Sequence, residues 1–287
     1  MTTLTSRNGV LEIGAHRPTV LINDQLRVMD QKPEVLNELR EGRLDSLIEL
    51  ARQGQQVGTD MVDILIDHPE LDEAALLPAI ATAVHTAIGC PISLDSRNPL
   101  ALEAALAALK PHKALINSVS SEPDLLAALL PLAKRYGAGV VGMPVGHGPG
   151  LPKTVEDRLE GAEVILRAAD EAGVPREDII IDAVCLASAV EPDSMRVTLE
   201  TLTALHERLG VATILGIGNA GHGMPNPTRI DLAYLVAAVP WGLDSALVNP
   251  ATPGLLESVR AIDFLSGRDA IGRRYIQHYR AGKTRHG

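Results

Sequence analysis

Short apolar runs rich in β-branched residues alternate along the chain with longer stretches of helical periodicity. Runs of the first kind predict buried strands, and stretches of the second kind predict helices that pack on them. The predicted strands cover residues 19–23, 61–66, 91–94, 114–117, 139–143, 179–181, 213–217 and 245–248. The predicted helices cover residues 33–53, 71–88, 99–109, 122–136, 154–172, 192–209, 228–239 and 254–265. Regular alternation of this kind predicts a parallel sheet.

The number and spacing of these units favour a closed (β/α)8 barrel, the TIM barrel, as a single domain over residues 1–287. An open doubly wound sheet is the structural alternative. Residues 1–16 show no clear periodicity, so an N-terminal extension of about 1–17 is expected to lie over the bottom of the barrel or to fray. Residues 254–265 are predicted as the last regular helix, and a basic tail of about 266–287 is expected to be solvated.

Composition and charge exclude several classes of function. The net charge of −10 argues against binding the phosphate backbone of a nucleic acid, and the few aromatic residues argue against stacking on bases. No apolar run is long enough to span a membrane, and the N-terminus lacks a signal-peptide pattern. Cys90 and Cys185 lie far apart, which suggests neither a disulfide framework nor a zinc knuckle and fits reduced thiols in the cytoplasm.

A glycine-rich turn follows the seventh predicted strand and carries a single amide side chain, Asn219. The turn contains G-x-G-x-x-G, the pattern of a dinucleotide site, in which a helix begins at the turn and meets the phosphates. Here Pro225 and Pro227 intervene, and the helical pattern begins only near residue 228. This context disfavours dinucleotide binding and leaves Asn219 free to point into a pocket at the strand end.

Polar residues gather where the predicted strands end, which in a (β/α)8 barrel is the face that carries the reactive groups. They are Asn23, Asp24, Asp67, His68, Asp95, Ser96, Asn117, Ser118, His147, Asp182, Asn219 and Asn249, with Met143 at the end of the fifth strand. No lysine stands there as a Schiff-base candidate, and no Arg or Lys forms a phosphate clamp. Carboxylates and amides without cations suit a neutral heteroaromatic ligand with N–H donors, such as the edge of a pterin.

Each of these residues also has a purely structural interpretation. Asp95, Asn117 and Asp182 are residue types that cap helices or turns, and Asn98 beside Pro99 is better explained as a helix cap than as a ligand. His68, His147 and His222 could gather around a metal, but the chain has no H-x-H or H-E-x-x-H motif, so no metal site is expected. Cys185 is expected to be a buried, inert thiol.

Six segments in order resemble the pterin-binding family, specifically its methyltetrahydrofolate:corrinoid protein methyltransferases and the folate module of cobalamin-dependent methionine synthase. The segments are Gly58–Ile64 (GTDMVDI), Pro91–Leu106 (PISLDSRNPLALEAAL), Ala114–Ser120 (ALINSVS), Ile179–Val184 (IIIDAV), Ile214–Asn226 (ILGIGNAGHGMPN) and Trp241–Pro250 (WGLDSALVNP). The likeness extends from about Thr19 to Pro250. The same superfamily contains dihydropteroate synthase.

The resemblance implies a (β/α)8 barrel that holds a pterin at its C-terminal mouth. It assigns the pterin edge to Asp95, Asn117 and Asp182, and it places Asn219 near the reacting ring nitrogen as the catalytic residue. Ser96, Met143, Gly216 and Gly218 are further candidates for contact with the pterin. The implied activity moves a methyl group between N5 of tetrahydrofolate and the cobalt of cobalamin on a separate corrinoid protein, with no metal bound by this chain. A homodimer is also implied.

The chain departs from the family pattern at several places. The first strand reads VLINDQ instead of the family's G-E-R-I-N, and Leu65 stands where the second strand usually has an Asn. The seventh loop reads Gly218–Gly221 (GNAG) instead of SNVS, and Pro227 replaces an expected arginine, with Arg229 nearby. Dihydropteroate synthase, a non-catalytic pterin- or corrinoid-protein-binding module and a metal-dependent barrel hydrolase are the alternatives. The turn after the seventh strand lacks the Arg and Lys that dihydropteroate synthase normally carries there.

Overall fold

Eight parallel strands close into a barrel in the computed structural model, which describes residues 1–285, with side chains described through residue 280. The strands are β3 (Val20–Arg27), β4 (Met61–Leu65), β5 (Ile92–Asp95), β6 (Leu115–Ser120), β7 (Gly139–Met143), β8 (Ile179–Asp182), β9 (Ala212–Gly216) and β10 (Ser245–Val248). Neighbours in sequence pair in order, and β10 pairs with β3 to complete the circle. The predicted (β/α)8 barrel is confirmed, and the open sheet is excluded.

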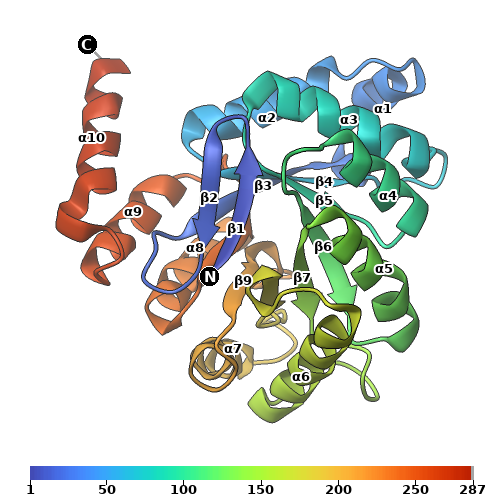
Figure 1. The fold of residues 1–287 in the computed structure, drawn as a ribbon. Coiled ribbons are helices and arrows are strands. Elements are labelled where there is room, and N and C mark those ends of the chain that lie inside the picture. The colour runs from blue at the N-terminus through green and yellow to red at the C-terminus, as the bar shows by residue number, and fades with distance from the viewer. Residues whose placement is uncertain (286–287) are drawn as a thin grey trace.

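Helices surround the barrel (Figure 1). They are α1 (Pro33–Arg40), α2 (Asp45–Val57), α3 (Glu73–Ile88), α4 (Pro99–Ala108), α5 (Pro123–Tyr136), α6 (Val155–Ala172), α7 (Ser194–Ala204), α8 (Pro227–Ala238), α9 (Leu255–Leu265) and α10 (Arg273–Arg285). The single helix predicted over 33–53 is wrong, because Gly42 adopts a left-handed φ of 73° and ends α1. The last turn of the helix predicted over 192–209 is a π-helical segment, Leu205–Leu209.

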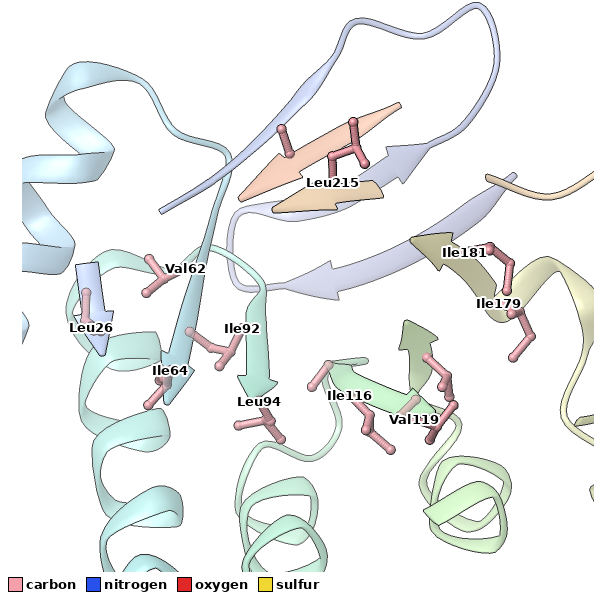
Figure 2. Packing of buried hydrophobic residues seen from close by; sticks show 14 of the residues in the cluster. Leu26, Val62, Ile64, Ile92, Leu94, Ile116, Val119, Ile179, Ile181 and Leu215 are labelled. Carbon is pink, nitrogen blue, oxygen red and sulfur yellow. The ribbon is translucent and has the colours of Figure 1, made fainter. Parts of the chain in front are cut away.

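Side chains alternate along each strand between the helices and the barrel interior. Figure 2 shows the outward set, in which Val62, Ile64, Ile92 and Leu94 point from β4 and β5 toward the helices. The inward set forms a second cluster that includes Ile22, Met61, Leu115, Val141, Ile180 and Ile214. The inward position nearest each carboxyl end therefore lies above this apolar interior, at the mouth of the barrel.

A hairpin that the sequence pattern did not predict covers the other end of the barrel. Strands β1 (Thr2–Ser6) and β2 (Gly9–Ile13) pair antiparallel and cross in front of the barrel in Figure 1. Leu4 and Ile13 are fully buried within the inward cluster, and Thr5 N donates to the oxygen of Lys113, two residues before β6 (3.2 Å). The N-terminal segment therefore lies over the bottom of the barrel, as expected. Its two strands were not predicted, because so short a segment shows only weak periodicity.

Helix α10 lies at the periphery of the molecule in Figure 1. Its presence shows that the prediction of 254–265 as the last regular helix is wrong. Asp269 accepts hydrogen bonds from the backbone N–H groups of Arg274 (2.9 Å) and Tyr275 (3.1 Å), and Arg274 also pairs with Asp60 at 2.9 Å. Capping of this kind begins a helix that has few apolar residues of its own. Within residues 1–285, no helix has the length and apolar character needed to cross a membrane.

Candidate active site at the carboxyl ends of the strands

Three polar residues from neighbouring strands lie together on one side of the barrel mouth. Asp95 ends β5 and pairs in register with Asn117 of β6, so both side chains take the same inward level. The Asn117 amide Nδ2 donates to Oδ1 of Asp63 on β4 at 3.1 Å. Asp63 and Asn117 are buried, with 5% and 7% of their surfaces exposed. The arrangement fixes the orientation of the Asn117 amide and leaves its oxygen available to a ligand.

The two carboxyl groups in this cluster influence each other's protonation. Burial raises the pKa of Asp95 to about 8, with a further increase from the charge of Asp63 and a decrease from Arg27. Burial also raises the pKa of Asp63 to about 6, against a decrease from hydrogen bonding with the Asn117 amide. Two carboxyl groups that interact in this way titrate as a pair, so together they retain a proton close to neutral pH.

Asp182 approaches the mouth from β8, two strands beyond Asn117. Its Oδ1 accepts a hydrogen bond from the backbone N–H of Val184 at 2.7 Å. Burial raises its pKa to about 6, while the Val184 N–H and the charge of Arg158 act in the opposite direction. Val184 has a φ of 63°, in the left-handed region that β-branched residues avoid. Strained backbone of this kind is concentrated at functional sites.

The loop after β9 brings Asn219 over the inward side of its own strand. A short 3-10 turn, Ile217–Asn219, follows the strand directly. A Cβ built on Gly216, the last residue of β9, would lie 3.7 Å from the Nδ2 atom of Asn219, its sole neighbour within 4 Å. Gly218 and Asn219 are both exposed, as expected for residues at a rim open to a ligand. Helix α8 begins only at Pro227, so the G-x-G-x-x-G turn does not lead directly into a helix.

The loop is anchored from α8. Asp231 accepts a hydrogen bond from the backbone N–H of Gly221 at 2.7 Å. Asp231 and Asp24 also line a cavity of about 180 Å³ beside Gly218 and Asn249. Burial raises the pKa of both carboxyl groups, and the charge of Asp231 contributes to the increase at Asp24. This side of the mouth is therefore acidic as well.

The remaining residues expected at the site differ in what they contact. Met143 ends β7 half-buried. The Ser96 hydroxyl donates to Glu73 Oε1 of α3 at 2.5 Å and accepts from the backbone N–H of Asn98 at 3.0 Å, so protein groups already engage it. Asn98 caps α4 through the N–H groups of Leu100 and Ala101, which confirms the helix-cap interpretation.

Sequence reasoning missed Asp63 as a site residue, although the alternation within its strand could have found it. Met61, Asp63 and Leu65 share the inward side of β4, and the strand ends at Leu65. Attention to the expected strand end singled out Asp67 instead, which lies in the following loop. There it pairs with Nε of Arg27 at 2.8 Å and accepts from the N–H of Met29 at 3.0 Å.

The described part of the chain contains no group of three or more His, Cys, Asp and Glu side chains arranged to hold a metal ion. Cys185 is buried, and burial raises the pKa of its thiol to about 12. Such a thiol remains protonated and is a poor nucleophile at neutral pH, in line with the inert role expected for it.

Comparison with known proteins identifies the family. Residues 33–249 match the model of the pterin binding enzyme family. The chain belongs to the pterin binding enzyme family. Among curated relatives, the methylcorrinoid:tetrahydrofolate methyltransferase of Eubacterium limosum is 25% identical over 79% of this chain and 84% of its own. The methionine synthase of Mycobacterium tuberculosis is 28% identical over 70% of this chain, which spans 18% of that larger protein.

Solved structures show the same fold at lower identity. A dihydropteroate synthase from Coxiella burnetii, in complex with pteroic acid, superposes with a TM-score of 0.70 at 16% identity. It covers 94% of this chain and 100% of its own. The dihydropteroate synthase of Thermus thermophilus gives a TM-score of 0.67 at 24% identity, with 92% of this chain and 99% of its own covered. At these identities the likeness establishes the barrel fold.

Proposed function

We propose that this family member moves a methyl group between N5 of tetrahydrofolate and the cobalt of cobalamin carried by a separate corrinoid protein. The observation that carries the proposal is the convergence of Asp63, Asp95 and Asn117 at one side of the mouth, with Asp182 and Asn219 supplied by later strands. The match to this chain covers 84% of the Eubacterium limosum relative, and that protein is named for methyl transfer between a methylcorrinoid and tetrahydrofolate.

The polar groups suit the edge of a pterin. A ring N–H beside an exocyclic amino group presents two parallel donors, and an ionised carboxylate such as Asp95 can accept both. The Asn117 amide, already held by Asp63, can accept a further N–H through its oxygen. Asp182 supplies a second carboxylate for the other donors of the bicyclic ring. A bound pterin would thereby provide hydrogen bonds to buried polar groups that otherwise bear a desolvation cost.

We assign catalysis to Asn219. The methyl group leaves N5 without its bonding electron pair, so N5 gains electron density and takes up a proton from solvent. In the reverse reaction the N5 lone pair attacks the methyl group, and N5 releases its proton to solvent. An amide N–H donor that strengthens its hydrogen bond as this density develops lowers the barrier in either direction. The exposed position of Asn219 on the rim leaves its amide accessible both to a folate inside the mouth and to a partner docked above it. Cobalt on the partner supplies the centre that gives or receives the methyl group.

The direct test is methyl transfer between methylcobalamin and tetrahydrofolate by the purified protein. Asn219→Ala is expected to lower the rate about 100-fold, the usual effect of removing one transition-state donor, with little change in folate affinity. Asn37→Ala, which replaces an exposed Asn on α1, is the matched control and should leave the rate unchanged. Full turnover by the Asn219 variant would remove its assigned role.

The same preparation tests the alternatives. Condensation of a pterin pyrophosphate with p-aminobenzoate would replace our proposal with dihydropteroate synthase. Tight folate binding without methyl transfer, across several corrinoid proteins, would indicate a non-catalytic module. We also propose, from the family resemblance, that the chain forms a homodimer in the cytoplasm and binds its corrinoid partner at the mouth. Sedimentation velocity with and without the corrinoid protein measures both associations.

A further inference from the structure

We propose that Arg158 and Thr198 are positioning residues that hold the backbone turn after β8, so that the Asp182 carboxylate faces the bound pterin. This role rests on the proposed function for its ligand, but the contacts that define it belong to this chain alone. Neither residue lies at a strand end. Arg158 belongs to α6 and Thr198 to α7, on the outer layer of the barrel.

Arg158 is fully buried, yet it pairs with no carboxylate in the part of the chain that the structure describes. Its Nη1 donates to the backbone oxygen of Ala183 at 2.8 Å and to Oγ1 of Thr198 at 2.9 Å, and its Nε donates to Pro152 O at 3.2 Å. A buried guanidinium is normally retained with an acidic partner, because desolvation of its charge is expensive. Here the charge is instead directed at the backbone beside Asp182.

Thr198 continues the same chain of hydrogen bonds. Its hydroxyl receives the Arg158 donor and itself donates to the backbone oxygen of Val184 at 2.9 Å. Both carbonyls that follow Asp182, those of Ala183 and Val184, are thus bound by side chains from the helical layer. The N–H of Ala183 donates to Ile214 O of β9 at 3.2 Å, so the turn is also held from the neighbouring strand.

The backbone held in this way is one that would otherwise relax. Val184 has a φ of 63°, which brings its branched Cβ close to its own carbonyl oxygen. The peptide group between Ala183 and Val184, whose oxygen Arg158 binds, presents its N–H to Asp182 Oδ1 at 2.7 Å, and this hydrogen bond orients the carboxylate. Without the Arg158 and Thr198 contacts, this peptide group is free to rotate as the backbone of Val184 relaxes, and the rotation withdraws the N–H from Asp182.

Arg158 also acts on Asp182 through its charge. The guanidinium lowers the pKa of Asp182 against the increase caused by burial. Cys185 of the same loop and Tyr234 of α8 are also packed in this region, and burial raises the pKa of both, so both are neutral at physiological pH. The carboxylates of Asp157 and Asp231 lie near enough to act on Arg158 and on Cys185, respectively. Arg158 is therefore the charged group that favours the ionised form of Asp182.

A pair of threonines on α7 gives a matched experiment. Thr198 and Thr201 are both fully buried, but the Thr201 hydroxyl donates within its own helix, to Val197 O at 2.7 Å. Thr198→Val should raise the dissociation constant for tetrahydrofolate about tenfold, because it removes a hydrogen bond that holds the turn and thereby orients the Asp182 carboxylate toward the pterin. Thr201→Val should change it by less than about twofold, and Thr198→Ser should restore most of the affinity because it keeps the hydroxyl.

Two further measurements separate positioning from stability. Amide exchange of Val184 should accelerate in Thr198→Val and not in Thr201→Val, with no ligand present. Arg158→Met should weaken tetrahydrofolate binding most near pH 6, since loss of the positive charge raises the pKa of Asp182 further and leaves less of it ionised there. Equal affinity and equal Val184 exchange in the Thr198 and Thr201 variants would overturn the proposal. If the unaltered protein binds no tetrahydrofolate, the proposed function fails, and the exchange measurement still decides whether these residues hold the turn.

Discussion

Replacing Asp63 by Asn isolates the charge that controls the Asp95 carboxyl group. An Asn at this position keeps the size of the side chain and an Oδ1 atom that can accept from the Asn117 amide, which lies 3.1 Å from Asp63 Oδ1. It removes the negative charge that, after burial, contributes most to raising the pKa of Asp95. The variant therefore tests the electrostatics of the site with little change in its packing.

The register of β4 and β5 sets the size of the effect. Asp63 pairs with Ser93, so Asp95 lies one strand across and two residues further along, or roughly 8 Å away by standard strand spacings. At an effective dielectric constant of about 20, two charges at that distance interact by about 2 kcal/mol. That corresponds to roughly 1.5 pH units, which would lower the pKa of Asp95 from about 8 to between about 6 and 7.

The assay is the affinity for tetrahydrofolate as a function of pH. Because ionised Asp95 accepts the pterin N–H groups, affinity in the unaltered protein should rise from about pH 6 and level off above about pH 8. Asp63→Asn should shift this curve downward by one to two pH units, and binding near pH 6.5 should become roughly tenfold tighter. Asp67→Asn is the control. The Asp67 carboxylate is more exposed than that of Asp63 and pairs with Arg27, so the affinity curve of this variant should move less along the pH axis. An unchanged curve in Asp63→Asn, or an upward shift, would refute this account.

Three more predictions follow from burial and packing. Asp95→Asn should raise the free energy of unfolding by several kcal/mol at pH 8 and leave it nearly unchanged at pH 4, measured in urea, because a carboxyl whose pKa is raised by folding destabilises the fold as pH rises through that interval. Leu4→Ala should lower the free energy of unfolding by about 3 kcal/mol, because Leu4 is fully buried in the barrel floor, and a loss below about 1 kcal/mol would show that the hairpin is dispensable. Gly221→Ala places a Cβ 2.5 Å from the backbone oxygen of Pro227, so it should displace the Asn219 loop and reduce the rate of methyl transfer at least about tenfold. Gly148→Ala is the control, because a Cβ there has open space around it and should leave the rate unchanged.

The alternation of strands and helices was sufficient to predict the barrel, because each strand is buried on both sides and reads as a short apolar run. Asp95, Asn117 and Asp182 stood out for the same reason, since each interrupts such a run at its end. Asp63 did not stand out, because it lies within β4 and its polar character is visible only once the inward side of that strand is known. Local pattern identifies the end of a strand more readily than the side that an internal residue faces.

The segments outside the repeated units were harder to predict for a different reason. Leu4 and Ile13 are buried in a cluster with residues from β3, β4, β6, β7, β8 and β9. Contacts this far away in sequence leave no periodicity in a short hairpin. Helix α10 begins through the Asp269 cap and the Arg274 to Asp60 pair, and it exposes apolar side chains such as Ile276. Elements that are fixed by long-range contacts carry a weak local signal.

The partners of the buried acids differ between the two ends of the barrel. At the N-terminal end, Asp60 accepts from the Leu21 N–H at 2.9 Å and pairs with Arg274, while Asp244 accepts from the Thr213 N–H at 3.0 Å. At the mouth, Asp95 has no hydrogen-bond donor among the described residues, and burial raises its pKa. An acid at the first end completes the protein's own hydrogen bonds, whereas the half-buried Asp95 has no donor in the described part of the protein and is open to the donors of a ligand. Tetrahydrofolate should therefore stabilise the protein more at pH 8 than at pH 6, since the cost of the ionised carboxylate that it relieves is larger there.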